Sequence, residues 1–306
     1  MLGEIFYWIL NMSILGTFTG FIVLIIRKIK RLPRFVPYVL WLVPCVRFVI
    51  PFGIGSAFSL MNVISKLTTK TIVIYGETSI LPEFSMTNSI MAAEDYFPIV
   101  YKTNLLESVF SVASVIWAVF AAAALIASVS LYFVTKAEFK NAELIRDNVY
   151  ASDKILSPAV YGVFKPRIIL PKGLLDNDIP YILQHENIHI HRGDNLWRVI
   201  AVVTACIHWF NPFIWLLLKC FFADMELSCD EKVLKKYGVE KQKEYATVLV
   251  NCESNKTMFA SAFGGAKTRV RIENILSYKR FTAFSSVCFL VLIIVIAVVL
   301  LTNTAV

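Results

Sequence analysis

The sequence is poor in charged residues for its length. Only 17% of its 306 residues are charged, 57% are hydrophobic, and the mean hydropathy is +0.65. Soluble globular proteins average about 25% charged and about 45–50% apolar residues. The composition therefore excludes an ordinary soluble domain and favours a protein that is embedded in a membrane.

The sequence also lacks any Cys-x-x-Cys pair among its six cysteines. This absence argues against a structural zinc site built from cysteines, and the scattered spacing indicates no disulfide framework. We therefore interpret the cysteines as small apolar residues of packed helices. They are Cys45, Cys206, Cys220, Cys229, Cys252 and Cys288.

Long apolar runs predict membrane spans, each of which needs on the order of 20 mostly apolar residues. Three runs meet this requirement, about Ile5–Ile26, Leu106–Val134 and Phe281–Leu301. A fourth, about Phe35–Phe52, is interrupted by three prolines and contains Arg47, which must reach the membrane surface or pair. No basic residue precedes the first run and no small-residue cleavage site follows it. We therefore expect a retained span rather than a secretory signal.

Basic residues predict the orientation of these spans. The loop 27–34 holds five basic residues and no acidic ones, which predicts a cytoplasmic position. The N-terminus and the loop 53–104 then lie outside, the segment 136–280 lies in the cytoplasm, and the tail 302–306 lies outside. The net charge of +8 follows from the cytoplasmic segments, which meet anionic membrane lipid. No direct nucleic-acid partner is expected.

Residues 185–189 read His-Glu-Asn-Ile-His, an HExxH motif. Histidines four residues apart lie on one face of a helix, so His185 and His189 can bind one metal ion. Glu186 is placed to activate a water on that ion as general base. The motif therefore indicates a zinc peptidase, and the alternative is a pair of polar residues on a solvent-facing helix.

The residues around the motif favour a helix. Asp178 is placed to cap its start, and Pro180 suits its first turn. Gly193 lies where the helix should end. These signals predict a helix of about four turns that presents the motif.

A catalytic zinc site commonly has three protein ligands and one water. The candidates for the third ligand are His191, Asp194, His208, Asp224, Glu226, Asp230 and Glu231. His191 lies about 200° round a helix from His189 and faces away. Asp194 follows Gly193 and is placed to cap the next helix or to support a ligand.

The apolar stretch 196–222 decides among these candidates, because it is broken by Asn211 and Pro212. A single spanning helix here would put the motif and the later acidic residues on opposite membrane faces. A hairpin bent at Pro212 has arms of about 24 Å and returns Glu226 to the level of the motif. We therefore predict Glu226 as the third ligand, with Asp230 one turn later orienting a histidine. The alternative is that these two acids form a solvated helix face.

Two short strands are expected before the motif, at 158–164 and 167–170, with a Lys-Pro turn between them. Metallopeptidases commonly bind an extended substrate along such an edge. The alternative is a hairpin with no substrate contact. The predicted substrate edge consists of Val160, Tyr161 and Gly162.

The segment 261–265 lies between the motif and the last apolar run and ends in two glycines. It is either a self-cleavage loop, cut at Ala262 or Phe263, or a simple turn. No residue stands out as the donor for an oxyanion. His208 is one candidate, although we expect it to pack within the hairpin.

Four blocks in this order, 157–171, 185–194, 208–215 and 226–234, resemble those of the Bla/Mec-type antirepressor membrane metallopeptidases. The blocks read Ser-Pro…Lys-Pro-Arg-Ile-Ile-Leu-Pro, His-Glu-x-x-His-x-x-Arg-x-Asp, His-Trp-Phe-Asn-Pro…Trp and Glu-Leu-Ser-Cys-Asp-Glu-Lys-Val-Leu. Members of that family are bacterial sensor-transducers that respond to beta-lactams. A more distant similarity is to membrane zinc peptidases of the prenyl-protein and heat-shock type.

The resemblance implies a gluzincin in which His185, His189 and Glu226 bind one Zn2+ ion and Glu186 is the catalytic base. It also implies a bacterial cell-membrane protein that cleaves a cytoplasmic repressor of antibiotic-resistance type genes, directly or through an intermediate, and cleaves itself. The antibiotic sensors carry an extracellular penicillin-binding domain after the last span. This sequence ends after its last apolar run and has no Ser-x-x-Lys motif, so we do not expect these residues to sense beta-lactams.

These features predict a mainly α membrane protein with four transmembrane helices and a cytoplasmic gluzincin-like zinc metallopeptidase domain. That domain should contain a small β-sheet and a helical hairpin near the membrane. The expected boundaries are 1–134 for three spans (about 5–26, 35–52 and 106–134), 135–280 for the peptidase with its hairpin 195–237, and 281–306 for the last span and tail. A signal-relaying scaffold with a non-catalytic zinc site, a constitutive quality-control protease, and assembly as a homodimer stay open.

Overall fold

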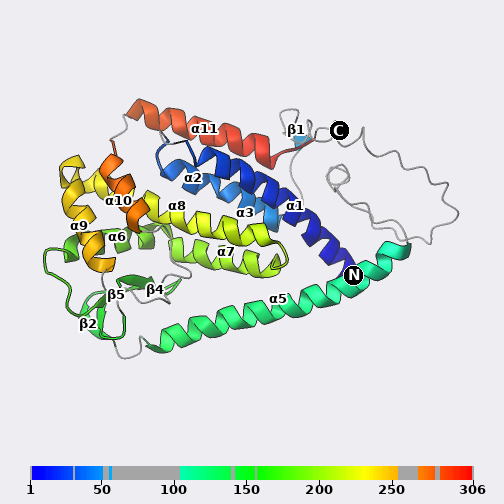
Figure 1. Ribbon diagram of the computed structural model, residues 1–306, viewed down its shortest axis with the longest axis horizontal. Coiled ribbons are helices and arrows are strands. Elements are labelled where there is room, and N and C mark those ends of the chain that lie inside the picture. The colour runs from blue at the N-terminus through cyan, green and yellow to red at the C-terminus, as the bar shows by residue number, and fades with distance from the viewer. Residues whose placement is uncertain are drawn as a thin grey trace. The chain divides into compact units, whose positions relative to one another are not determined.

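The computed structural model is mainly helical, and the residues that it describes also form a four-stranded sheet and a short two-stranded one (Figure 1). It describes residues 2–29, 32–50, 55–56, 104–138, 142–155, 157–253, 268–279 and 283–304. The helices are α1 (Leu2–Ile26), α2 (Phe35–Leu40), α3 (Leu42–Val49), α5 (Asn104–Glu138), α6 (Ile179–Arg192), α7 (Asp194–Ile207), α8 (Pro212–Tyr237), η2 (Val239–Lys241), α9 (Gln242–Glu253), α10 (Thr268–Ser277) and α11 (Ala283–Leu301). The strands are β1 (Gly55–Ser56), β2 (Glu143–Arg146), β3 (Val149–Ser152), β4 (Ala159–Tyr161), β5 (Arg167–Pro171) and β6 (Asn303–Thr304).

Among the residues that the structure describes, two helical segments are long and apolar enough to cross a membrane, Leu2–Ile26 and Ser108–Ala137. The other two predicted spans correspond to the shorter apolar segments Phe35–Val49 and Val287–Leu301. The first of these is divided into α2 and α3 rather than being one helix. Pro44 explains the division, because it has no backbone N–H to donate to the carbonyl four residues earlier.

One compact unit comprises 1–23, 40–118 and 287–306. Within it, Arg47 is buried and pairs as expected. Its Nε donates to the Leu300 carbonyl and its Nη2 to the Thr302 carbonyl, both at 3.0 Å. α1 also packs closely in this unit, because the Phe48 ring lies where a side chain at Gly16 would be. The buried guanidinium of Arg47 and the absence of a side chain at Gly16 therefore both determine how this apolar unit packs.

The other unit, 24–39 and 119–286, contains a four-stranded sheet in the order β2-β3-β5-β4. β4 and β5 form the predicted antiparallel hairpin, whereas the preceding β2 and β3 were not predicted. β5 is central and pairs in parallel with β3. Its side chains Ile168 and Leu170 pack with Ile182 of α6 and Val248 of α9. The sheet therefore supports α6 and leaves β4 at its edge.

α6 begins and ends largely as its sequence predicts. Pro180 lies in the first turn, and Gly193 ends the helix in the left-handed region with φ 67°. The predicted cap is wrong, because the Asp178 side chain makes no capping hydrogen bond. Its carboxylate instead accepts from Asn251 of α9 at 2.9 Å. A tertiary partner has therefore replaced the local one.

α7 and α8 form the predicted bend at Asn211 and Pro212. The Asn211 side chain caps α8 by accepting from the Phe213 N–H at 3.0 Å, and Pro212 occupies its first position. His208 is buried in the turn between the helices. α8 returns along α6 and packs with it, α9 and α10 in one apolar cluster. The fully buried members of that cluster include Cys229, Val233, Leu234, Tyr245 and Ile275.

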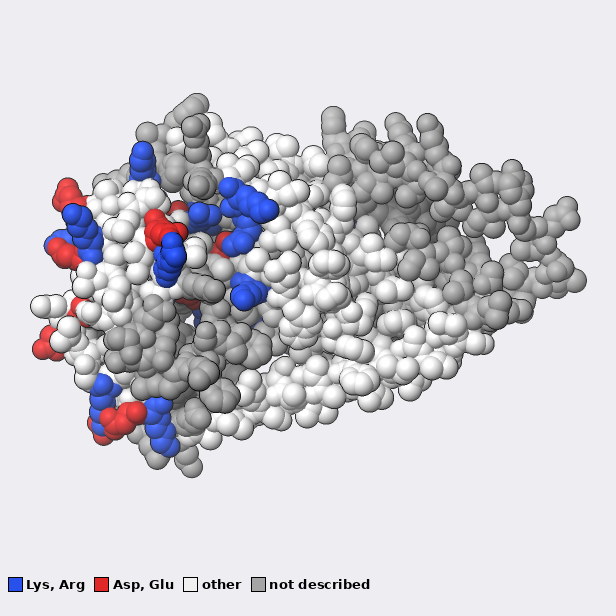
Figure 2. All heavy atoms as spheres, in the orientation of Figure 1, with Lys and Arg blue, Asp and Glu red and all other residues white. Residues whose placement is uncertain are grey.

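Arg27 and Arg34 of the basic loop 27–34 are held by protein partners. Arg27 Nη2 contacts the Asp224 carboxylate of α8 at 2.8 Å. The Arg34 backbone N–H donates to Glu231 at 2.8 Å, and its Nε donates to Asn274 at 2.9 Å. Charged side chains gather over the part of the surface formed by α9, α10 and the sheet (Figure 2). The basic loop is therefore part of the charged unit that contains the HExxH helix.

Candidate metal centre

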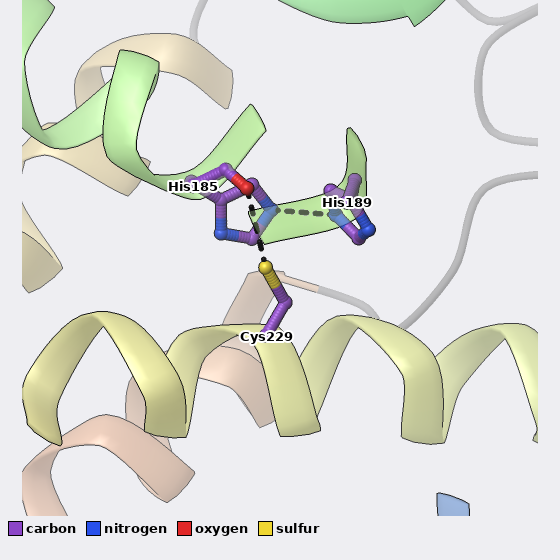
Figure 3. Close-up of side chains that lie close together, drawn as sticks. All are labelled: His185, His189 and Cys229. Carbon is purple, nitrogen blue, oxygen red and sulfur yellow. Dashed lines mark hydrogen bonds between the residues drawn. The ribbon is translucent and has the colours of Figure 1, made fainter. Parts of the chain in front are cut away.

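The two motif histidines lie on the face of α6 that meets α8. Both are buried, and their Nε2 atoms are 3.1 Å apart. Figure 3 shows both imidazoles pointing toward α8. The four-residue spacing thus produces a pair of converging nitrogen donors, as a metal site requires.

Glu226 of α8 completes a triangle of donor atoms with these histidines. Its Oε2 lies 3.3 Å from His185 Nε2, and its Oε1 lies 3.6 Å from His189 Nε2. Ligand atoms bound tetrahedrally to zinc at about 2.0–2.2 Å lie about 3.3 Å from each other. All three separations are close to this value. The residues present therefore fit a zinc ion with three protein ligands.

Cys229 lies one turn after Glu226 and reaches the same region (Figure 3). Its sulfur and the two histidine nitrogens lie within 4.8 Å of one another. The thiol donates to the backbone carbonyl of His185 at 3.3 Å and belongs to the apolar cluster between α6 and α8. Glu226 fits the metal better, because its oxygens approach both nitrogens at ligand distance while the Cys229 thiol is directed at the backbone.

Asp194 supports His189 instead of capping α7, which makes no side-chain cap. Its Oδ2 lies 2.5 Å from His189 Nδ1, and Arg192 Nη2 contacts the same oxygen at 2.6 Å. The Tyr38 hydroxyl of α2 donates to Oδ1 at 2.8 Å. When His189 Nδ1 donates to Asp194, the lone pair of its Nε2 is left for a metal ion. Burial alone would raise the pKa of Asp194, but His189 and Arg192 lower it.

His185 is supported by a hydroxyl and a carboxylate. Its Nδ1 lies 2.9 Å from the Tyr245 hydroxyl of α9, which donates to Asp230 at 2.7 Å. Asp230 Oδ1 also lies 3.3 Å from His185 Nδ1. The relay from Nδ1–H through Tyr245 to Asp230 leaves the Nε2 lone pair for a metal. Asp230 thus lies where the hairpin prediction put it, with Tyr245 as an additional partner.

Arg271 of α10 neutralises Asp230. Its Nε and Nη2 contact the two carboxylate oxygens at 2.8 and 2.7 Å. Burial would raise the pKa of Asp230, but Arg271 and His185 lower it to about 2. Asp230 is therefore ionised at neutral pH, as an acceptor for Tyr245 must be to hold the relay.

Glu226 lies between two arginines. Arg198 of α7 contacts Oε1 at 2.7 Å, and Arg271 contacts Oε2 at 3.5 Å. Burial would raise the pKa of Glu226, but His189, His185 and Arg271 lower it well below its usual range. The carboxylate is thus ready to bind a cation at neutral pH.

Glu186 differs from the other acids of the site. Its residue is 9% exposed, and its carboxylate has no hydrogen-bond or ion-pair partner among the residues that the structure describes. The neighbouring acids Asp194, Glu226 and Asp230 are each held by an arginine. A carboxylate without a cationic partner is available to a water molecule, which suits a residue that accepts a proton.

The predicted substrate edge is the outer strand of the sheet. Asn195 of α7 donates to the carbonyls of Val160 and Gly162 at 3.3 and 2.8 Å, so these carbonyls point away from β5. The Tyr161 hydroxyl donates to the Tyr132 carbonyl of α5 at 2.7 Å, and the two rings stack. The edge therefore adjoins α7, the helix that also carries Asp194.

Several residues of the site were not found from the sequence. Tyr38, Arg198, Tyr245 and Arg271 have no motif spacing relative to the histidines, since they arrive from α2, α7, α9 and α10. Among the residues that support the histidines, Asp230 was predicted from the hairpin, and Arg192 and Asp194 belong to the motif block that resembles the family. Ala262 and Phe263, the predicted self-cleavage residues, lie outside the residues that the structure describes.

The chain is similar in sequence to proteins of known name. The chain is 33% identical over 119 residues to the regulatory protein BlaR1 of Bacillus licheniformis, a match that covers 38% of this chain and 20% of that protein. It is 31% identical over 110 residues to the methicillin resistance mecR1 protein of Staphylococcus aureus, covering 35% and 19%. The match to the regulatory protein BlaR1 of Staphylococcus aureus is 25% over 129 residues, covering 39% and 22%.

The matched stretch thus spans about a fifth of the length of these relatives. A family model covers far more of this chain. The model described as BlaR1 peptidase M56 matches residues 7–276, which include the HExxH helix, the hairpin and α10. The match extends over most of the sequence and confirms the resemblance that its ordered blocks predict. The chain therefore belongs to the BlaR1 peptidase M56 family.

Proposed function

We propose that this protein is an integral-membrane zinc metallopeptidase of the gluzincin type that acts in signal transduction. The observation that carries this proposal is the triangle of donor atoms on His185, His189 and Glu226, with sides of 3.1, 3.3 and 3.6 Å. Three protein ligands leave a fourth position for water or substrate, which is typical of catalytic zinc sites. A peptide bond in a cytoplasmic protein is the proposed target.

The chain's own residues divide the work of hydrolysis. Zinc, when bound, acts as a Lewis acid and makes water more acidic. Glu186 takes a proton from the attacking water and delivers it to the leaving amine as the carbon–nitrogen bond breaks. Its lack of a cationic partner among the described residues supports this role. Asp194, and Asp230 with Tyr245, keep the two imidazoles in the tautomer that presents Nε2.

An extended substrate is proposed to bind along the outer edge of β4. β4 lies at the end of the strand order, so the outward groups of Val160 and Gly162 face no further strand of this sheet. Asn195 already donates to both carbonyls, which leaves the outward N–H groups to pair with a peptide. Strand addition of this kind gives affinity through the main chain and tolerates many side chains.

The biological substrate is proposed to be a cytoplasmic transcriptional repressor, with the segment 261–265 as a second, intramolecular target. The proposal rests on the family and on relatives that are named as regulatory and methicillin resistance proteins. It is compatible with action through an intermediate. No nucleic acid needs to bind this chain for such a function.

We propose a bacterial cell-membrane location with four spans, the site in the cytoplasm and both termini outside. Two long apolar helices and two shorter apolar segments support four spans. The contact of Arg27 with Asp224 supports the orientation, because it joins the basic loop to the helix that carries Glu226. The basic loop and the metal centre then share one face of the membrane, as the positive-inside rule requires.

The test compares the zinc-loaded full chain with its Glu186→Gln variant in proteoliposomes. Both are incubated with a library of denatured cytoplasmic peptides, and new termini are identified by mass spectrometry. We expect new termini with the wild type and a rate lower by roughly 10²–10⁴ with the variant, at equal zinc content. Equal zinc content without cleavage by the wild type would support a signal-relaying scaffold instead.

A further inference from the structure

The first turns of α7 connect three parts of the site. Asp194 binds His189, and the adjacent Asn195 binds the β4 carbonyls. Arg198, one turn after Asp194 and Asn195, contacts Glu226. Residues three and four apart share one helix face. The same face of α7 therefore carries a contact to the proposed substrate edge, through Asn195, and a contact to the metal ligand, through Arg198.

Arg198 and Arg271 both contact Glu226 but are held differently. Arg271 has 12% of its side chain exposed and is fixed by two contacts to Asp230. Arg198 has 36% of its side chain exposed, and Glu226 is its sole polar partner in the part of the chain that the structure describes. A guanidinium has five N–H donors, so Arg198 retains most of its donor capacity. Arg271 has a structural partner, whereas Arg198 is open to a ligand.

The negative charge of the Glu226 carboxylate cannot fully balance both a metal ion in the triangle and the Arg198 guanidinium. The contact to Arg198 uses Oε1, which is also the oxygen nearest His189. When a metal cation takes up the charge of this carboxylate, the guanidinium loses much of its electrostatic partner. It is then a partly exposed cation beside the metal, on the helix whose Asn195 binds the proposed substrate edge. Such a position favours an anionic oxygen.

We propose that Arg198 is a catalytic residue of this site, which donates hydrogen bonds to the carbonyl oxygen of the scissile peptide as negative charge develops there. The inference rests on the proposed function and assigns the oxyanion donor that the sequence leaves unassigned. Water adds to the carbonyl carbon and the carbon–nitrogen bond breaks, while Glu186 carries the proton from water to the amine. Arg198 stays protonated throughout and transfers no proton.

The experiment measures anion binding, which does not depend on peptide cleavage. The full chain in detergent micelles is loaded with Co2+, and azide is titrated while the visible spectrum of cobalt is recorded. We expect Arg198→Gln to weaken azide binding by roughly tenfold to a hundredfold, the value of one hydrogen bond to a charged group. The azide affinity of Arg198→Lys should fall between those of the wild type and Arg198→Gln, because lysine keeps the charge but loses the forked donors.

Arg269→Gln is the matched control, since Arg269 is an exposed arginine of this unit that pairs with Glu273. It should bind azide as the wild type does. Cobalt affinity is measured in parallel and should change by less than about threefold in Arg198→Gln, because the lost pair is partly exposed. Unchanged azide affinity in Arg198→Gln overturns the inference, as does an equal loss in Arg269→Gln. Failure of the proposed function would appear separately, as a wild-type protein that binds cobalt and azide but cleaves no peptide.

Discussion

α5 and α8 distribute polarity in opposite ways. Most of the candidate membrane span in α5, Ser108–Ala137, is exposed, including apolar side chains such as Val119 and Ile126. α8 fully buries two carboxylates, Asp224 and Asp230. Exposed apolar surface of this extent is rare on soluble proteins and is typical of a helix that faces lipid. The comparison therefore separates a helix with the exposed apolar surface of a candidate membrane span from a helix whose carboxylates are buried in protein.

Buried charge on α8 is tolerated because each acid has its own arginine. Asp224 pairs with Arg27, and Asp230 pairs with Arg271. Isolated buried charges are very costly, whereas paired and hydrogen-bonded ones are tolerated. Arg27 comes from the basic loop, which precedes α8 in the sequence, and Arg271 comes from α10, which follows it. Segments from both earlier and later in the chain therefore hold α8 in place. The rigidity of α8 in turn holds Glu226 opposite the histidines.

The largest expected effect breaks one of these pairs. Asp230→Ala leaves the Arg271 guanidinium buried without its carboxylate, which should lower the free energy of unfolding by about 3–5 kcal/mol. Chemical denaturation of the metal-free protein in detergent micelles measures the loss. Asp176→Ala, at an exposed position, is the control and should change stability by less than about 0.5 kcal/mol. Equal stability of the two variants would show that α8 does not depend on this pair.

A slightly smaller effect tests the other helix of the comparison. Val119 is 61% exposed near the middle of the apolar segment of α5. Val119→Lys should raise the apparent free energy of membrane insertion by about 3 kcal/mol, whereas Val119→Ala should change it little. Glycosylation mapping in microsomes measures both. A lysine accepted without cost would mean that this face of α5 meets water or polar protein.

Glu231 of α8 tests the buried acids of this helix through the pH dependence of stability. Burial raises the pKa of Glu231 to about 7, above about 4.3 in an unfolded chain. The folded protein holds this proton more tightly, so the contribution to stability is present below about pH 4.3 and is lost as the pH rises to about 7. The loss should be on the order of 3 kcal/mol in the wild type.

Glu231→Gln should remove most of this pH dependence, because an amide cannot ionise but can still accept from the Arg34 N–H. Unfolding of both proteins is followed at several pH values between 4 and 8. The difference between the two proteins isolates the single group from all others that titrate. Parallel curves would contradict the assignment of this proton to Glu231.

The smallest predicted effect concerns the support of a metal ligand. Asp194→Asn keeps the shape but weakens the hold on His189, which should reduce zinc affinity by roughly 10–100-fold. Competition with a chromogenic chelator measures the affinity. Asp147→Asn, at a largely exposed carboxylate, is the control and should leave it unchanged. Equal affinities would mean that Asp194 holds Arg192 and Tyr38 rather than the histidine.

The sequence could predict those parts of the site that depend on neighbours within one or two helical turns. The HExxH spacing, Pro180 and Gly193 describe α6 almost completely. The bend at Asn211 and Pro212 follows from capping chemistry, and the length of the two arms brings Glu226 to the histidines. In each case the relevant physics is local geometry.

The remaining features depend on tertiary contacts that no local pattern encodes. Tyr245 is 60 residues from His185 in the sequence, and Arg271 is 86 residues away. β2 was missed because all four of its residues are exposed, so it has no alternation of polar and apolar positions. Asp178 was assigned as a cap from its position just before the helix. Its actual partner, Asn251, lies on α9, and no local pattern indicates that contact.

Zinc K-edge X-ray absorption of the zinc-loaded full chain tests the central claim most directly, since it identifies the ligand atoms. The account predicts two imidazoles and oxygen donors at about 2.0–2.2 Å, with no sulfur, and loss of one donor in Glu226→Ala. A sulfur at about 2.3 Å would assign Cys229 as a ligand and contradict the triangle of His185, His189 and Glu226.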